Sequence, residues 1–569
     1  MTRALFFVWC FSFMGVIHAQ TAVNKYWVFF TDKSANEYML SRPESFLSAQ
    51  SLERRARLRK AAEISDLPVC ETYVQQVRDA GAQVHVYSKW LNAVSVTATD
   101  AQLVHISMLP CVRNIQPVIR YKILNEQLSP INDRVFYKQA APADITAELG
   151  YAAAQIEQIN LDTLLEIGLT GDSMVIAVLD AGFFGVDTAA LFQSFWDKEQ
   201  ILGFYNFPGN DDQVFNIWSG YHGSWVMSVI GGDIDSVYSG SAPEADFYLY
   251  RTEIAETEYV VEEDHWLAAA ERADSVGADI INSSLGYTEF DNPAENHTWD
   301  DLDGNTTVVT IAADMAAEKG ILVCNSAGNL GASAWHYISM PADGDSVFSI
   351  GGVGIDSNHI YFSGFGPTAD GRLKPNVVAL AAGSAVLSPN GYVEYLSGTS
   401  FSSPLIAGAC ATLWQAFPEA TNMDIMHAVE MSAHLYTTPN DSMGYGIPNF
   451  GKAYALLDSM FPDIPVDSTG DTTVVDTSDE DTTINTAILD LAPYVNGGIF
   501  TVQLQSNVNL NALFSVYNMQ GALMHQDSFT LTAGQSMQTQ WDATGWSQGV
   551  YVCVLRSGPC KQSVQVFVQ

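Results

Sequence analysis

Short apolar segments alternate with amphipathic segments from about residue 148 to residue 360. The apolar segments predict buried strands at residues 174–180, 245–251, 278–286, 320–329 and 346–354. Between them, segments such as VVEEDHWLAAAERADSVG and TVVTIAADMAAEKG repeat apolar residues with the period of a helix. Strands that alternate with helices indicate an α/β domain with a parallel sheet covered on both faces. Functional side chains in such a domain gather at the carboxyl ends of the strands.

Different patterns flank this region on both sides. Before it, KYWVFFTDK (25–33) and VHVYSKWLNAVSV (84–96) predict strands, and the helical segments between them complete a small α+β unit. After it, the acidic, Thr-rich residues 463–484 have no period that could build a core and predict an extended linker. Residues 485–569 alternate apolar and polar positions between Gly and Asn turns, which predicts a small antiparallel β-sandwich domain.

The beginning of the chain has the layout of a secretory signal. Arg3 precedes an apolar stretch, residues 4–17, and a small residue stands directly before Gln20. The stretch is too short to span a membrane as a helix, and no later stretch is long and apolar enough. We therefore predict an exported protein with a signal peptide over residues 1–19 and no transmembrane segment.

Charge is divided unevenly along the chain. Residues 1–145 carry a net charge of +4 and the remainder −43, which together give the −39 of the whole sequence. A body this acidic excludes nucleic acid and anionic membranes as preferred partners. It attracts the basic N-terminal segment, but screening over about 8–10 Å limits that attraction to assisting contact.

The cysteines suggest an oxidising compartment. Two pairs could form disulfide bonds there, Cys70 with Cys111 and Cys553 with Cys560. Cys324 and Cys410 lie in apolar runs and are expected to be buried thiols, and no cysteine spacing suggests a zinc site.

The stretch GTSFSSPLIAG (398–408) places Ser400 directly before an apolar segment that predicts a buried helix. Ser is a good helix N-cap and Pro404 suits the first turn, so Ser400 could be a cap and nothing more. Alternatively its hydroxyl is a nucleophile, placed where the N–H groups of a helix N-terminus favour negative charge. A serine nucleophile needs a base, an acid that orients the base and a donor to the oxyanion.

Candidates for these three partners stand at the ends of other predicted elements. Asp180 ends the strand VIAVLD, His222 begins the apolar helix of YHGSWVMSVIGG, and Asn329 ends the strand that closes with NSAGN. Alone, each has an ordinary interpretation as a strand terminator, a helix N-terminal residue or a turn former. The chain order Asp, His, Ser is more specific, because chymotrypsin-like enzymes and α/β-hydrolases have other orders. We predict that these residues converge with Ser400 at one edge of the sheet.

The stretches VIAVLDAGF, HGSWVMSVIGG, INSSLG, SAGN and GTSFSSPLIAG resemble the motif blocks of the subtilase family of serine peptidases. The likeness runs over about residues 148–457. It implies a role for seven residues, namely the triad Asp180, His222 and Ser400, the oxyanion donor Asn329, and the substrate-binding segment Ser284, Leu285 and Gly286. In the family this last segment pairs its backbone with an extended peptide substrate, which is strand addition.

The flanking regions carry further resemblances. The N-terminal α+β unit is similar to a subtilase propeptide, which assists folding and blocks the cleft until it is cut. The terminal β domain, with GIFTVQL, VYNMQG and GVYVCVL, is similar to the C-terminal sorting domain of type IX secretion cargo. The expected organisation is a signal peptide (1–19), a propeptide and junction (20–147), a subtilisin-like peptidase domain (148–460), an acidic linker (461–484) and a sorting domain (485–569).

These resemblances imply a secreted serine endopeptidase, made as a self-processed zymogen and located outside the cell or on its outer surface. Its expected partners are protein or peptide substrates, its own propeptide and the type IX secretion machinery. The sequence departs from the family pattern after the acid and the histidine, for example at Ala181 and Trp225. A catalytically inactive subtilase fold that serves in surface binding or adhesion is therefore the alternative.

Two further possibilities are less favoured. An esterase or lipase could use the G-x-S-x-G pattern at residues 545–549, but this pattern lies between predicted strands with no following helix. No cofactor is expected for the chemistry. Structural calcium is possible, and WDDLDGN (299–305) offers oxygen ligands, although we favour an acidic surface loop there and place no metal site.

Overall fold

The structure is a computed structural model that describes most of the chain after residue 23. The described ranges are 24–117, 149–254, 257–461, 489–496, 499–506, 510–518, 523–532, 535–543, 545–546, 549–557 and 560–568. The predicted signal peptide, residues 122–147 and residues 463–484 lie outside these ranges. Among the described residues, no helix has both the length and the apolar character needed to cross a membrane.

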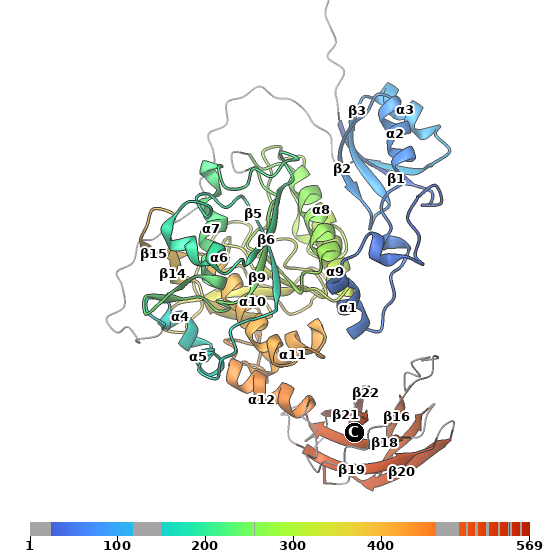
Figure 1. Cartoon of the computed structure of the whole chain (residues 1–569), viewed down its shortest axis with the longest axis vertical. Coiled ribbons are helices and arrows are strands. Elements are labelled where there is room, and N and C mark those ends of the chain that lie inside the picture. Colours follow the sequence, from blue (N-terminus) through green and yellow to red (C-terminus); the bar gives the residue numbers. More distant parts are fainter. Residues whose placement is uncertain are drawn as a thin grey trace, which may run out of the picture. The chain divides into compact units, whose positions relative to one another are not determined.

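The N-terminal unit is a four-stranded antiparallel sheet in the order β2-β3-β1-β4, with two helices (Figure 1). Its elements are β1 (Asn24–Phe30), α2 (Glu71–Asp79), β2 (Gln83–Ser88), β3 (Ala93–Ala98), α3 (Asp100–Ser107) and β4 (Val112–Pro117). The core includes Val28, Val74 and Ile106, one from the sheet and two from the helices. The predicted α+β character is confirmed.

Two expectations for this unit were wrong. Residues 84–96 form a β2–β3 hairpin rather than one strand, because the chain turns at Asn92, which adopts a positive φ of 50°. Asn tolerates this conformation better than most residues. The disulfide that the sequence allowed is also not formed, since Cys70 and Cys111 are separate buried thiols and the Cys111 thiol donates to Gln76 Oε1 at 3.6 Å.

The central domain contains a seven-stranded sheet in the order β13-β12-β11-β10-β5-β9-β6, in which every pair is parallel. Its strands are β5 (Val175–Asp180), β6 (Ile201–Asn206), β9 (Asp246–Arg251), β10 (Ile280–Ser283), β11 (Leu322–Ser326), β12 (Phe348–Val353) and β13 (Val377–Leu380). Two hairpins accompany it, β7 (Asp233–Ile234) with β8 (Tyr238–Ser239) and β14 (Ala382–Leu387) with β15 (Val393–Ser397). The predicted parallel α/β fold is confirmed.

Helices cover both faces of this sheet (Figure 1). They are α4 (Ala153–Gln158), α5 (Asp162–Leu165), α6 (Gln193–Asp197), α7 (Tyr221–Gly231), α8 (Val261–Val276), α9 (Val308–Glu318), α10 (Thr399–Gln415), α11 (Asn422–Ser432) and α12 (Phe450–Met460). Successive residues of a strand point to opposite faces. Ile176 and Val178 of β5 face the core beneath α7 and α10, and all six residues of β5 are buried.

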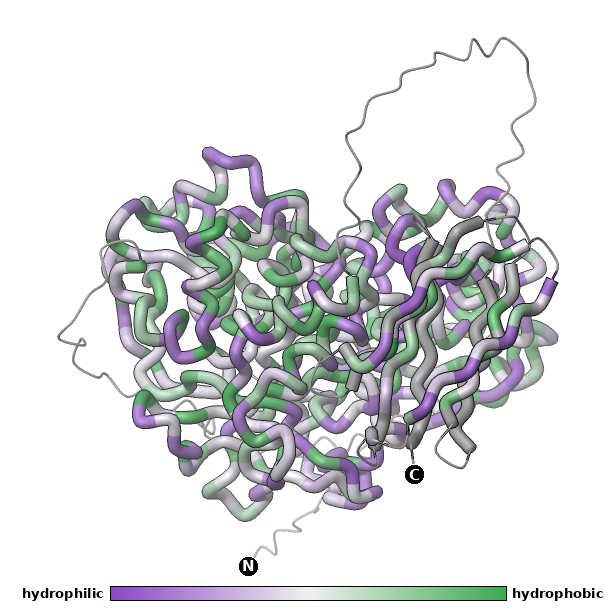
Figure 2. The backbone as a smooth tube through the Cα atoms, turned by 90° about the horizontal axis from the view of Figure 1, so that it is seen from below, coloured by the Kyte–Doolittle hydropathy of each residue, from purple (hydrophilic) through white to green (hydrophobic). Residues whose placement is uncertain are grey.

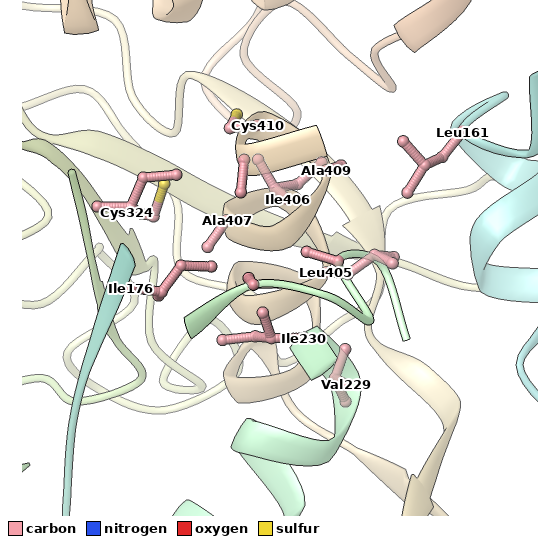
Figure 3. Close-up of a cluster of buried hydrophobic side chains, with 14 of the residues drawn as sticks. Leu161, Ile176, Val229, Ile230, Cys324, Leu405, Ile406, Ala407, Ala409 and Cys410 are labelled. Atoms are coloured by element: carbon pink, nitrogen blue, oxygen red, sulfur yellow. The ribbon is translucent and has the colours of Figure 1, made fainter. Parts of the chain in front are cut away.

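Helix α10 passes through the middle of this core, and residues 399–414 of it are all buried. Figure 3 shows Leu405 and Ile406 of α10 beside Val229 and Ile230 of α7. Figure 2 shows hydrophobic positions concentrated inside the central domain. A helix that is apolar on all sides is stable only when it is surrounded in this way, so the residues at its N-terminus are held rigidly.

Residues 40–63 belong to the compact unit of the central domain and not to the N-terminal unit. They include α1 (Ala49–Arg57), which packs on α8. Arg54 and Arg55 of α1 are almost completely buried, and both bind the buried carboxylate of Asp274, Arg54 at 2.6 Å and Arg55 at 2.9 Å.

Backbone carbonyl groups complete the site around Arg54. Its guanidinium donates to the carbonyls of Asp274 at 3.1 Å and Lys319 at 3.2 Å, and also to that of Ala278. These carbonyls lie at the C-terminal ends of α8 and α9, where the helix dipole favours a cation. At α1, the attraction between the basic N-terminal segment and the acidic body therefore acts through buried ion pairs.

The C-terminal part is an antiparallel β sandwich with sheets in the orders β16-β17-β20 and β19-β18-β21-β22. Its strands are β16 (Leu489–Asn496), β17 (Ile499–Ser506), β18 (Leu510–Asn518), β19 (Leu523–Leu531), β20 (Ser536–Asp542), β21 (Gly549–Ser557) and β22 (Cys560–Val568). Phe500 and Val502 of one sheet share a core with Phe514 and Val516 of the other.

The pairing of β21 with β22 contradicts the second expected disulfide. Cys553 is opposite Val564, whereas Cys560 is opposite Ser557, so the two cysteines are separated along the strands. Cys553 is a buried thiol. The G-x-S-x-G pattern lies between β20 and β21, and the described residues there form no helix, as expected for a turn.

Candidate active site

Asp180 is the last residue of β5 and is completely buried. Its carboxylate accepts a hydrogen bond from the N–H of Ala181 at 2.7 Å and faces the ring of His222. His222 Nδ1 lies 2.8 Å from one carboxylate oxygen and 2.9 Å from the other. The structure therefore brings together the predicted acid and the predicted base, although Asp180 comes from the sheet and His222 from a helix.

His222 is the second residue of α7, and glycines allow this helix to approach the end of β5. A Cβ atom on Gly223 would lie 2.2 Å from the carbonyl oxygen of Gly182 and 3.0 Å from Asp180 Cβ. Gly182 itself has a φ of 132°, which a residue with a side chain rarely adopts. The small residues that follow the acid and the histidine therefore set the Asp180–His222 distance.

Ser400 is the second residue of α10, and 7% of its surface is exposed. Its backbone carbonyl accepts a hydrogen bond from Ser284 Oγ at 3.0 Å. Ser400 and His222 line the same cavity, whose volume is about 450 Å³. Within the described part of the chain, Ser400 Oγ makes no hydrogen bond, including none to His222. Catalytic hydrogen bonds are often long in unliganded sites and tighten when substrate binds.

Asn329 lines this cavity with a fixed amide orientation. Its Oδ1 accepts hydrogen bonds from the backbone N–H of Thr399 at 2.8 Å and from the Thr399 hydroxyl at 3.0 Å. Because a backbone N–H can only donate, the amide oxygen must face Thr399. Nδ2 is then left as a donor beside the N-terminus of α10.

The predicted substrate-binding segment, Ser284–Leu285–Gly286, follows β10 and also lines the cavity. Asn325 Nδ2 donates to the carbonyl of Leu285 at 3.1 Å. A Cβ atom on Gly286 would lie 2.0 Å from Ser339 Oγ, so only glycine fits there. Neighbouring elements thus hold the segment in place, and all seven predicted site residues lie at this cavity except Asp180, which is buried behind His222.

Sequence reasoning missed three acidic residues of the same cavity, Glu253, Glu258 and Glu262. Burial, with repulsion from Glu258, raises the pKa of Glu253 to about 8. Burial and repulsion from Glu253 likewise raise the pKa of Glu262. One signal was available, because Glu253 stands two residues beyond the carboxyl end of β9.

The acidic residues 299–305 bind their own loop instead of converging. Asp301 Oδ2 accepts hydrogen bonds from the N–H of Thr298 at 2.7 Å and from its hydroxyl at 2.8 Å. Asp303 Oδ1 accepts the N–H of Asn305 at 2.8 Å. In the described residues, no group of three or more His, Cys, Asp or Glu side chains is arranged to hold a metal ion.

Three family models match the chain in order. Residues 25–132 match the Peptidase S8 propeptide domain of Bacteroidota, residues 171–446 the subtilase family, and residues 495–569 the secretion system C-terminal sorting domain. The chain therefore contains a subtilase-family domain, with a propeptide domain before it and a secretion sorting domain after it.

The chain is also similar to individual proteins. The membrane-bound transcription factor site-1 protease of Homo sapiens is 26% identical over 320 residues, which cover 54% of this chain and 27% of the relative. Subtilisin NAT of Bacillus subtilis subsp. natto is 25% identical over 378 residues, covering 65% of this chain and 82% of the relative. The match thus spans about a quarter of the site-1 protease. The solved structure of the prenylagaramide maturation protease PagA has 22% identity and a TM-score of 0.41, covering 52% of this chain and 97% of that chain.

Proposed function

We propose that this protein is a serine endopeptidase that hydrolyses peptide bonds through an acyl-enzyme. The observation that carries the proposal is the 2.8 Å contact between Asp180 and His222 Nδ1, in a domain whose cavity is lined by His222, Ser400 and Asn329. With Nδ1–H donated to Asp180, His222 Nε2 is free to act as a base. We propose that this chemistry needs no cofactor. A structural role for calcium is a separate proposal.

The proposed reaction has two halves. His222 Nε2 removes the Ser400 proton as Oγ attacks the scissile carbonyl carbon, and Asp180 stabilises the resulting imidazolium. Asn329 Nδ2 and the backbone N–H of Ser400 donate to the oxyanion. His222 then gives its proton to the leaving amine as the C–N bond breaks. The acyl group stays on Ser400 Oγ as an ester. A water molecule, deprotonated by His222, attacks that ester and regenerates Ser400.

The remaining regions support an export route and a zymogen. A propeptide domain precedes the catalytic fold, so we propose that the chain is made inactive and that its own Ser400 cuts the junction between the two. The C-terminal sorting domain supports export through the type IX secretion machinery to the outer cell surface or the medium.

A fluorophosphonate probe tests the proposal against the inactive binding or adhesion alternative. Such a probe modifies a serine only when a neighbouring base activates it. We expect one adduct, which peptide mass mapping places on Ser400, and we expect His222→Ala to abolish it. An unmodified wild-type chain would favour the inactive alternative, and an adduct on the G-x-S-x-G turn would favour the esterase.

Asn329→Leu is expected to lower kcat by about 10²–10³-fold, the range found when one oxyanion donor is lost. The leucine side chain has a similar size and cannot donate to the oxyanion. The measurement is peptide hydrolysis at saturating substrate. Asn305→Leu, at an exposed position outside the cavity, is the matched control and should leave kcat unchanged. Equal turnover in Asn329→Leu and wild type would remove Asn329 from the mechanism.

A further inference from the structure

One wall of the catalytic cavity carries three acidic residues, Glu253, Glu258 and Glu262. None of the described residues that line the cavity is Lys or Arg. Glu253 follows β9, Glu258 lies in the loop before α8, and Glu262 is in the first turn of α8. The three carboxylates therefore share a confined space with His222 and Ser400.

The Glu253 side chain has one oxygen unused. About nine-tenths of the residue is buried. Its Oε1 accepts hydrogen bonds from the Tyr287 hydroxyl at 2.7 Å and the Thr252 hydroxyl at 2.8 Å. Within the described residues, Oε2 of Glu253 has no hydrogen-bond partner. Oε2 is not one of the fully buried polar atoms, so it is open to the cavity that Glu253 lines, and an acceptor without a donor at such a place can bind a donor from a ligand.

Glu262 is held in place beside it. Both of its oxygens are used, one by the N–H of Ile254 at 2.6 Å and the other by the N–H of Tyr259 at 2.8 Å. These bonds fix the orientation of its carboxyl group. Because both oxygens already accept hydrogen bonds, Glu262 shapes the cavity wall rather than serving as a direct ligand.

We infer that the cavity selects peptide substrates with a Lys or Arg side chain near the scissile bond, and that Glu253 Oε2 accepts its charged hydrogen bond. The inference rests on the proposed peptidase function. A cation at this position would supply the missing donor and favour the ionised form of Glu253. A metal ion fits less well, because no group of three ligating side chains converges in the described residues.

The chain itself contains sequences with the required chemistry. The residues between β4, which ends at Pro117, and the described start of the central domain at residue 149 include four basic side chains, namely Arg120, Lys122, Arg134 and Lys138. Their structure lies outside the described residues. If self-processing occurs in this segment, the inference predicts that the cut lies within a few residues of one of them, and the N-terminal sequence of the processed protein identifies the position.

The direct test compares arginine with citrulline, its neutral isostere, in otherwise identical quenched peptides. The pair is moved through each position on both sides of the scissile bond. At a pH above about 8, where Glu253 is ionised, we expect kcat/KM to favour arginine by roughly 30-fold or more at one position, as for a desolvated charge pair. Glu253→Gln should bring this ratio close to one. Glu318→Gln, an exposed carboxylate on α9 outside the cavity, is the control and should keep the wild-type ratio.

The pH dependence of the same ratio gives a second readout. The groups that face Glu253 are Glu258, Glu262, Tyr287 and Asp180. Because its pKa is raised to about 8, Glu253 is protonated below that pH and ionised above it, whereas arginine stays charged throughout. The arginine-to-citrulline ratio should therefore rise as pH increases through about 8. His222 acts on both peptides equally and cancels in the ratio.

The outcomes separate this inference from the proposed function. Failure of the fluorophosphonate probe to modify the wild type removes the peptidase itself. A labelled wild type that cleaves arginine and citrulline peptides equally at every position overturns the inference alone, as does a labelled Glu253→Gln variant that keeps the preference. If Glu253→Gln does not fold, Glu258→Gln replaces it, and an unchanged ratio in that variant with no pH dependence in wild type also overturns the inference.

Discussion

Ser400→Ala is expected to lower kcat for peptide hydrolysis by about 10⁶-fold, because the other site groups cannot act as the nucleophile. The same change should leave the N-terminal region attached. Intact mass would show this directly, since wild type should lose about 14 kDa, the mass of residues 20–147 at the mean residue mass of the chain. Casein digestion provides the activity measurement.

Helix α10 contains a matched control residue, Ser402, two positions after Ser400. Ser402 is also buried in the first turns of α10, and its hydroxyl donates to the carbonyl of Thr399 at 3.0 Å. Ser402→Ala loses this single hydrogen bond and should keep both self-processing and casein digestion. Processing of the Ser400→Ala chain at the wild-type rate, in the absence of other proteases, would show that Ser400 is not the nucleophile and has only a structural role in the first turn of α10.

Asp180→Asn is expected to lower kcat by about 10⁴-fold without disturbing the fold. The carboxylate accepts hydrogen bonds from the Ala181 N–H and the His222 Nδ1–H. An asparagine has one side-chain oxygen instead of two, and only that oxygen can accept these bonds. If its NH₂ group faces the ring, it stabilises the wrong tautomer, with the proton on Nε2. His222 then cannot remove the proton of Ser400.

The Asp180→Asn measurement combines turnover with fluorophosphonate labelling. Both should slow, since both require the base. Asp187→Asn is a suitable control because Asp187 is an exposed carboxylate a few residues further along the chain. Wild-type turnover in Asp180→Asn would show that the short contact with His222 is structural and that another group orients the imidazole.

The sequence predicted the central sheet because parallel strands are buried on both faces and therefore form continuous apolar runs. It predicted the convergence at the cavity for a related reason. The chain places Asp180, Asn329 and the segment 284–286 at the carboxyl ends of such strands or within three residues of them, and these ends share one edge. The sequence indicated that Gly182 and Gly223 form turns. Only the structure shows that they set the distance between Asp180 and His222.

Other features could not be predicted because they depend on tertiary contacts. The turn at Asn92 lies inside an otherwise uniform strand pattern, so residues 84–96 resembled one element. The expected disulfides followed from spacing alone, and the strand register separates Cys553 from Cys560. The acidic wall combines Glu253 with Glu258 in the following loop and Glu262 in the first turn of α8, and nothing in their spacing shows that they share a cavity with Ser400.

The buried site formed by Arg54 and Arg55 of α1 distinguishes two events, hydrolysis of the chain and dissociation of the cleaved N-terminal region. Hydrolysis of the junction breaks a covalent bond, whereas Arg54 and Arg55 remain bound to Asp274 and to the helix ends. Departure of α1 requires two guanidinium groups to be rehydrated while the Asp274 carboxylate and three carbonyls lose their donors. The proposed activation of the zymogen would therefore have a chemical step, set by the catalytic residues, and a separate dissociation step, set by salt and by the affinity of one helix.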